Sequence, residues 1–291
     1  DVTQSFTVDQ AAQTIVFGAL GNKTVGDADF TVTATGGASG NDVTFATLST
    51  ACSVTPTGTV TILAAGSCAI TASQAGNANY AAASDVTQSF TINTAPQTII
   101  FGALGDKTVG DADFTVTATG GASGNAVTFA TLSTACSVTP TGTVTILAAG
   151  ACAITASQAS NANYTAATDV TQSFTINKAD QAIVFGALGN KTVGDADFTV
   201  SATGGASGNA VTFATLSTAC SVTPTGTVTI LAAGACAITA SQAGNANYSA
   251  APDVTQSFTI NKADQAIVFG ALGNKTVGDA DFTVSATGGA S

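Results

Sequence analysis

Residues 50–72 read TACSVTPTGTVTILAAGSCAITA, and their pattern predicts how the whole chain folds. Apolar side chains such as Val60 and Ile62 fall on alternate positions, with threonine, serine or alanine between them. Because side chains alternate between the two faces of a strand, this pattern predicts three short strands with one apolar and one hydroxyl-rich face. Residues 56–58 (PTG) supply the first turn, and Gly66 helps to form the second.

A cysteine lies near each end of this segment. Cys52 and Cys68 share the inward parity, so we expect both inside one small sandwich, bonded to each other across 16 residues. A closed loop of that size contributes about 3 kcal/mol in the chain-entropy model. The alternative is two free, buried cysteines; zinc is disfavoured because the chain has neither histidine nor a CxxC spacing. A disulfide implies an oxidising compartment, and hence an exported protein found outside the cell or on its surface. The same pairing is predicted for Cys136 with Cys152 and for Cys220 with Cys236.

The chain is an internal repeat. The word DVTQSFT begins at Asp1, Asp85, Asp169 and Asp253, so successive copies are 84 residues apart, without insertion or deletion. This word comes after the other strands of a copy, which makes it the last strand of a module. We therefore expect the end of a preceding module at 1–10, complete modules at 11–94, 95–178 and 179–262, and the opening strands of a following module at 263–291.

Within the first module, turn signals separate short alternating segments. Seven such strands predict an all-β fold, an antiparallel β-sandwich. A β-solenoid is the structural alternative, but its coil usually takes about 20–30 residues. Since only NTAP, at 93–96, separates the last strand of the first module from the first strand of the second, we expect an elongated, fairly stiff array. The expected strands are 14–20, 30–34 and 43–45, three within 50–72, and 86–92.

Composition excludes several functions. The 291 residues include 6 basic and 17 acidic side chains, giving a net charge of -11, which disfavours nucleic acid and anionic membranes as partners. No apolar run approaches the roughly 18 residues that span a bilayer. Histidine, arginine and glutamate are absent, so we do not expect an enzyme. No signal peptide opens this exported chain, and we expect it to be part of a longer gene product.

Three kinds of candidate site repeat with the module. Each module has one tyrosine, expected to anchor its loop by packing on the sandwich and bonding a loop backbone group through the hydroxyl. Each also has a DxD pair, for which calcium is the functional interpretation and a solvated or turn-capping role the alternative; no other cofactor is expected. Glycosylation sequons occur at Asn22, Asn163, Asn190, Asn247 and Asn274. The tyrosines are Tyr80, Tyr164 and Tyr248, and the weak calcium candidates are Asp27, Asp29, Asp111, Asp113, Asp195 and Asp197.

Several sequence segments of the repeat resemble those of a known protein family. KTVGDADF (23–30), VTFATLS (43–49), GNANY (76–80) and the paired cysteines around LAAG resemble the bacterial immunoglobulin-like (Big or MBG-type) tandem repeats of large surface or secreted proteins. The resemblance implies immunoglobulin-like sandwich modules used as spacers or stalks in tandem arrays, often in adhesins. We therefore expect a structural array forming an extracellular fibre or cell-surface stalk. Its expected partners are like chains, through lateral or end-to-end association. Modules that themselves bind glycan or a host protein are the alternative.

Overall fold

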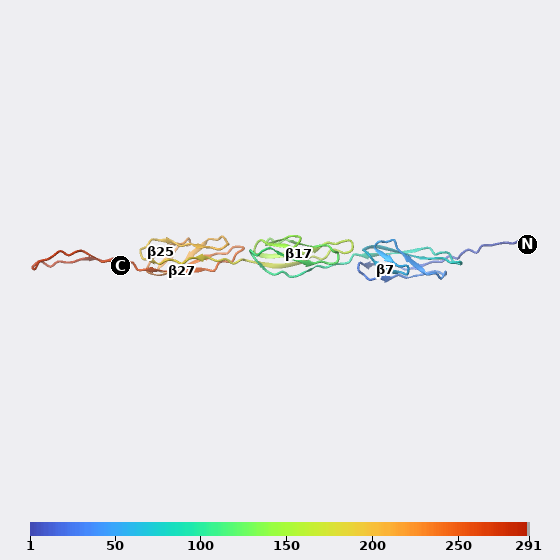
Figure 1. Cartoon of the computed structure of the whole chain (residues 1–291), viewed down its shortest axis with the longest axis horizontal. Coiled ribbons are helices and arrows are strands. Elements are labelled where there is room, and N and C mark those ends of the chain that lie inside the picture. Colours follow the sequence, from blue (N-terminus) through green and yellow to red (C-terminus); the bar gives the residue numbers. More distant parts are fainter. Residues whose placement is uncertain (290–291) are drawn as a thin grey trace. The chain divides into compact units, whose positions relative to one another are not determined.

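The computed structural model describes residues 1–289, and the regular structure of these residues consists of strands (Figure 1). Nine strands recur in each of three copies, which confirms the predicted all-β chain of immunoglobulin-like sandwich modules with an 84-residue repeat. The chain divides into two compact units. One comprises residues 1–106, 112–147 and 151–175; the other comprises 107–111, 148–150 and the chain from Ile176 onward.

The strand bounds show how closely the copies match. The first copy contains β1 (Val16–Phe17), β2 (Lys23–Thr24), β3 (Phe30–Thr31), β4 (Ala34–Thr35), β5 (Val43–Ala46), β6 (Cys52–Val54), β7 (Thr59–Ile62), β8 (Gly66–Gln74) and β9 (Val86–Asn93). The second contains β10 (Ile100–Phe101), β11 (Lys107–Thr108), β12 (Phe114–Thr115), β13 (Ala118–Thr119), β14 (Val127–Thr131), β15 (Cys136–Val138), β16 (Thr143–Ile146), β17 (Gly150–Gln158) and β18 (Val170–Asn177). The third contains β19 (Val184–Phe185), β20 (Lys191–Thr192), β21 (Phe198–Thr199), β22 (Ala202–Thr203), β23 (Val211–Ala214), β24 (Cys220–Val222), β25 (Thr227–Ile230), β26 (Gly234–Gln242) and β27 (Val254–Asn261), and it is followed by β28 (Val268–Phe269) and β29 (Ala286–Thr287).

The first copy, which lies wholly in the first unit, is built from two main sheets. One sheet has the strand order β2-β9-β8-β5, and the other has the order β3-β7-β6. Strands β1 and β4 form a separate antiparallel pair. The β8–β9 ladder is antiparallel and places Cys68 opposite Phe90, whereas β2 pairs with β9 in parallel. The sequence had predicted a purely antiparallel sandwich. The structure differs at one edge, where β2 runs parallel to β9.

The strands predicted at the start of the module are shorter than expected. Residues 14–20 contain only the two residues of β1, and residues 30–34 divide into β3 and β4. The division occurs because the chain changes sheets there: β3 pairs with β7, whereas β4 pairs with β1. Between them, the Val32 N–H donates to the Gly58 carbonyl at 2.8 Å. Strand β2 was not predicted, and together with the division of 30–34 it gives each copy nine strands in place of the expected seven.

The turn predicted at residues 56–58 depends on its glycine. Gly58 has a φ of 96°, in the left-handed region that side chains disfavour, and its N–H donates to the Thr55 carbonyl at 2.9 Å. A Cβ at this position would lie 2.4 Å from the Val32 carbonyl oxygen. A larger residue would therefore disturb both the turn and the crossing from β3 to β4.

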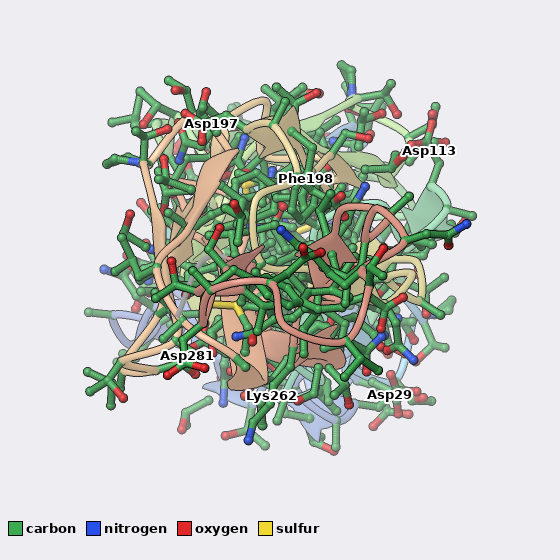
Figure 2. The ribbon with its side chains drawn as sticks, turned by 90° about the vertical axis from the view of Figure 1, so that its left-hand side faces the viewer. Asp29, Asp113, Asp197, Phe198, Lys262 and Asp281 are labelled. Atoms are coloured by element: carbon green, nitrogen blue, oxygen red, sulfur yellow. A yellow bond between two sulfur atoms is a disulfide. The ribbon has the colours of Figure 1, made fainter. Side chains whose placement is uncertain are left out.

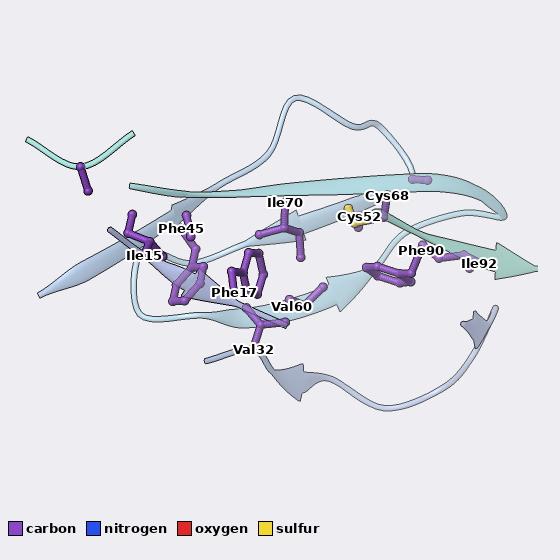
Figure 3. Packing of buried hydrophobic residues seen from close by; sticks show 13 residues of the cluster. Ile15, Phe17, Val32, Phe45, Cys52, Val60, Cys68, Ile70, Phe90 and Ile92 are labelled. Carbon is purple, nitrogen blue, oxygen red and sulfur yellow. A yellow bond between two sulfur atoms is a disulfide. The ribbon is translucent and has the colours of Figure 1, made fainter. Parts of the chain in front are cut away.

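The core lies between the two main sheets (Figure 3). Val60 of β7 and Ile70 of β8 are fully buried, and burial of side chains of this size contributes about 1.5–3 kcal/mol each. The Phe17 and Phe45 rings pack with centroids 5.5 Å apart. The inward parity read from residues 50–72 is therefore confirmed for its apolar positions.

Residues 263–289 differ from the three complete copies. They contain β28 and β29, paired with each other, and their side chains are exposed. The predicted module boundaries and the assignment of 1–10 and 263–291 to neighbouring modules stay predictions; residues 290–291 lie outside the described part.

Candidate functional site

The cysteines form one disulfide in each copy. Cys52 and Cys68 are joined with their Cα atoms 5.8 Å apart, and both are buried. Cys52 lies on β6 and Cys68 on β8, so the bond connects the three-stranded sheet to the four-stranded sheet (Figure 3). The structure likewise joins Cys136 to Cys152 and Cys220 to Cys236, and residues 1–289 contain no free cysteine.

The aspartate pairs lie in exposed turns. Asp27 Oδ2 accepts a hydrogen bond from the Thr24 N–H at 2.9 Å, and the Asp27 N–H donates to the Thr24 carbonyl at 3.0 Å. Asp113 Oδ2 accepts from Thr145 Oγ1 at 3.0 Å. Figure 2 shows the side chains of Asp29 and Asp113 at the outer surface. Within residues 1–289, no three acidic, cysteine or histidine side chains are grouped so that they could share a metal ion. These contacts favour the turn-capping alternative, and calcium stays untested. The same turn contact is made by Asp111 and Asp195, and Asp197 accepts from Thr229 Oγ1.

The tyrosine loop is held by its backbone. The Tyr80 N–H donates to Asn77 Oδ1 at 3.0 Å, and the Tyr80 carbonyl accepts from the Asn77 N–H at 2.9 Å. Tyr80 also forms a parallel bridge with Ala11, at the start of the module. In the part of the chain that the structure describes, no hydrogen bond involves a tyrosine hydroxyl, so the expected hydroxyl contact is not made. The anchoring role predicted for Tyr80, Tyr164 and Tyr248 stays a prediction.

The asparagine of the NKT sequon has a structural partner. Asn22 Oδ1 accepts the Thr91 N–H at 2.9 Å. The second copy has Asp106 at this position, and its Oδ1 accepts the Thr175 N–H at 2.8 Å. Asparagine and aspartate thus accept the same backbone N–H through Oδ1. The role of this position is therefore to supply an acceptor oxygen to strand β9 or β18.

Two buried glutamines, which sequence reasoning missed, organise the glycine-rich loop at residues 36–41. Gln74 Oε1 accepts the Gly37 N–H at 2.7 Å, and its Nε2 donates to the Asn41 carbonyl at 2.7 Å. Gln13 Oε1 accepts the Ser39 N–H at 3.0 Å. The sequence carried a signal for one of them, because Gln74 has the inward parity of Ile70 and Ala72.

A shallow hollow lies beside an exposed leucine in the first two copies. Leu48 is fully exposed and borders a hollow of about 240 Å³ that is also lined by Thr71, Ser73 and Asp85. The equivalent hollow beside Leu132 has the same volume, about 240 Å³. Hydroxyls, one carboxylate and an apolar side chain are thus presented together, in a hollow smaller than the roughly 300–1,000 Å³ of typical small-molecule pockets.

Comparison with known proteins does not assign the chain to a family. No protein-family model matches the sequence, and no curated protein sequence matches it. Drosophila N-cadherin EC1-3 matches with a TM-score of 0.35 and 12% identity, covering 86% of this chain and 99% of that chain. Mouse cadherin-23 EC22-24 matches with a TM-score of 0.32 and 16% identity, covering 89% and 97%. Domains 1-6 of the surface layer protein SbsC match with a TM-score of 0.28 and 16% identity, covering 88% and 41%. These values are too low to assign the chain to either group.

The described residues include no helix of the length and apolarity needed to cross a membrane.

Proposed function

We propose that the chain is a structural repeat array that forms an extracellular fibre or a cell-surface stalk, with each module stiffened by its own disulfide. The observation that carries this proposal is the uniformity of the copies. Turns that face solvent repeat their contacts as closely as the core does: Thr24 with Asp27 in the first copy recurs as Thr192 with Asp195 in the third. Selection for ligand binding would act on such loops, whereas a spacer requires only that each module fold alike.

The disulfides support both the location and the mechanical role. Disulfides persist in oxidising compartments, which agrees with a protein outside the cell or on its surface. Each one also connects the two sheets of its sandwich, so a module under tension cannot extend through the segment between its cysteines, which are 16 positions apart. No residue set described above points to catalysis, and the proposed role needs none.

Lateral association of like chains is part of this proposal, and the outer face of the four-stranded sheet supports it. Residues of β8 and β9 that point outward are uncharged (Ala, Ser, Thr and one Asn), such as Thr71 and Thr87, whose hydroxyls lie 2.8 Å apart. These strand positions therefore carry no charge that would repel a second chain of net charge -11, and one carboxylate, Asp85, borders them at the hollow beside Leu48. Replacing Thr71 by aspartate should weaken association in a sedimentation-velocity concentration series, because the added negative charge repels a partner of net charge -11. A wild-type chain that stays monomeric at the highest concentration would exclude lateral association.

Single-molecule stretching of the full chain tests the mechanical role. We expect three unfolding events with equal gains in contour length. Under reduction each gain should increase by about 50 Å, because the released loop extends by about 3.4 Å per residue. The Cα atoms joined by the disulfide are already 5.8 Å apart, and this distance is subtracted. Unfolding without discrete events would contradict the role of a load-bearing spacer.

Adhesive modules are the second candidate function. The hollow bordered by Leu48, Thr71 and Asp85 favours it because it recurs beside Leu132. To test it, the full chain is applied to a glycan array or to a host-cell extract. Binding that is lost when Leu48, Leu132 and Leu216 are replaced by serine would support this function in place of a purely structural one.

A further inference from the structure

Two segments without a role so far meet where one copy of the repeat follows another. Ala65 lies in the LAAG turn of the first copy (residues 63–66), and Asn163 lies in the NANY loop of the second (161–164). The Ala65 N–H donates to Asn163 Oδ1 at 2.9 Å, across 98 residues of sequence and within the first compact unit. Within the second unit, the Ala149 N–H donates to Asn247 Oδ1 at 3.0 Å.

The acceptor side chain is held in place by its own backbone. The Asn163 N–H donates to Asn161 Oδ1 at 2.8 Å, and the Asn163 carbonyl accepts the Ala95 N–H at 2.9 Å. These bonds fix the position from which the carboxamide projects. The oxygen is therefore preorganised for a donor from the preceding module, and little conformational freedom remains to be lost when the bond forms.

Burial of the acceptor loop depends on the presence of a preceding module. Asn163 and Asn247 are half-buried, whereas Asn79 is exposed, and only residues 1–10 precede the module to which Asn79 belongs. The three asparagines sit in the same loop sequence, NANY, and share the same local contacts: the Asn79 N–H donates to Asn77 Oδ1 at 2.8 Å. Neighbouring structure, and not local sequence, accounts for the difference.

The donor turn shows the converse dependence. Ala65 and Ala149 are half-buried, whereas Ala233 is exposed, and among the described residues only 263–289 follow the module to which Ala233 belongs. Each half of the contact is thus covered where a complete module lies next to it and open where none does. Every module carries both halves, so each can receive one neighbour and present itself to another.

The covalent connection between the copies is very short. The Asn93 carbonyl accepts the Val25 N–H at 3.0 Å inside the first copy, and Ala95 pairs with Tyr164 inside the second. Only Thr94 lies between these two anchored residues. The chain connection and the bond from Ala65 to Asn163 therefore attach the modules at two separate points, and two points restrict rotation where one would allow it.

We propose that the LAAG turn and the NANY loop form a module–module interface that sets the orientation of each module on the next, and that Asn163 and its copies are its positioning residues. The partner this surface recognises is another module of the same kind. The inference deepens the proposed structural role and rests on it for its purpose, but the contact itself can be tested separately.

The test compares two chemically identical substitutions in the full chain. Asn163→Ala removes the contact between modules, whereas Asn79→Ala removes the same side chain from the same loop where, among the described residues, it accepts no hydrogen bond. Spin labels are placed at Leu48 and Leu132, both fully exposed, through non-natural amino acids that leave the disulfides intact. Pulsed electron–electron double resonance then measures the distribution of distances between the two spin labels, and its width is compared among the variants.

We expect Asn163→Ala to broaden the distribution at least twofold and Asn79→Ala to leave it unchanged. Asn163→Asp keeps an acceptor oxygen and should retain the narrow distribution, which separates loss of the bond from damage to the loop. Equal widths in all variants, or equal broadening by the two alanine substitutions, would overturn the inference. A broadened distribution in Asn163→Ala, together with stretching curves that lack discrete events, would keep the interface and reject the load-bearing role.

Discussion

Replacing Cys52 and Cys68 together by alanine removes one cross-link and leaves the other two. The cysteines are 16 residues apart, and the loss of a loop of this size costs about 3 kcal/mol in the chain-entropy model. For a domain of this length, each kcal/mol lowers the unfolding midpoint by about 4–8 °C. The first module should therefore unfold about 12–24 °C below the two that keep their disulfides.

Differential scanning calorimetry of the full chain measures this shift. The copies share their strands and their disulfide, so the wild type should give one main transition. The variant should move about one third of the unfolding enthalpy to the lower temperature, because enthalpy scales with the number of residues that unfold. Fully reduced wild-type protein is the control, since all three modules then lose the cross-link while their side chains stay unchanged.

Two outcomes would refute this reasoning. A single transition within about 5 °C of the wild type would show that the cross-link contributes about 1 kcal/mol or less. A shift of the entire enthalpy would show that the modules unfold as one cooperative body, so that stability is not held module by module.

Three further changes test other contacts. Gln74→Leu should destabilise the first module by about 2–4 kcal/mol, because the Gly37 N–H and the Asn41 carbonyl lose their buried partner; calorimetry would show one third of the enthalpy at a lower temperature. Asn22→Ala should destabilise by about 1 kcal/mol through loss of the acceptor for the Thr91 N–H, whereas Asn22→Asp should be nearly neutral in the same measurement. Millimolar calcium should leave the unfolding midpoint unchanged, because Asp27 already caps its turn.

Each of these predictions has a contradicting result. A neutral Gln74→Leu would mean that water replaces the glutamine, and Gln158→Leu in the second module provides the matched repeat of the experiment. Equal effects of Asn22→Ala and Asn22→Asp would show that the position needs more than an acceptor oxygen. A rise of several degrees with calcium, but not with magnesium, would restore the metal site interpretation.

Alternation predicted the parts of the fold that bury side chains in a regular way. Cys52, Val60 and Ile70 lie on the face that their parity assigns, and β9 occupies nearly the residues expected for the last strand. Strand β2 was missed because the two residues Lys23 and Thr24 carry no alternation, and its pairing with β9 is a long-range property.

The contacts that organise loops were the least predictable. Gln74 could be assigned to the inward face, but its partners, Gly37 and Asn41, lie more than thirty residues away and contribute backbone atoms that any residue has. The bond from Ala65 to Asn163 has the same character, since a backbone N–H leaves no mark on composition. The sequence repeat identified the LAAG and NANY segments as recurring parts of each copy. Only the three-dimensional structure showed that they contact each other.

Near-identical modules in one chain face a particular hazard during synthesis, because a strand or a thiol of one copy can pair with its equivalent in the next. The placement of each bonded cysteine pair on neighbouring parts of one copy reduces that hazard. Closing the short loop from Cys52 to Cys68 costs less entropy than joining Cys68 to Cys136, whose roughly fourfold longer loop adds about 1.2 kcal/mol. Oxidation therefore favours the correct partner as soon as each copy emerges, and a long array can mature one module at a time.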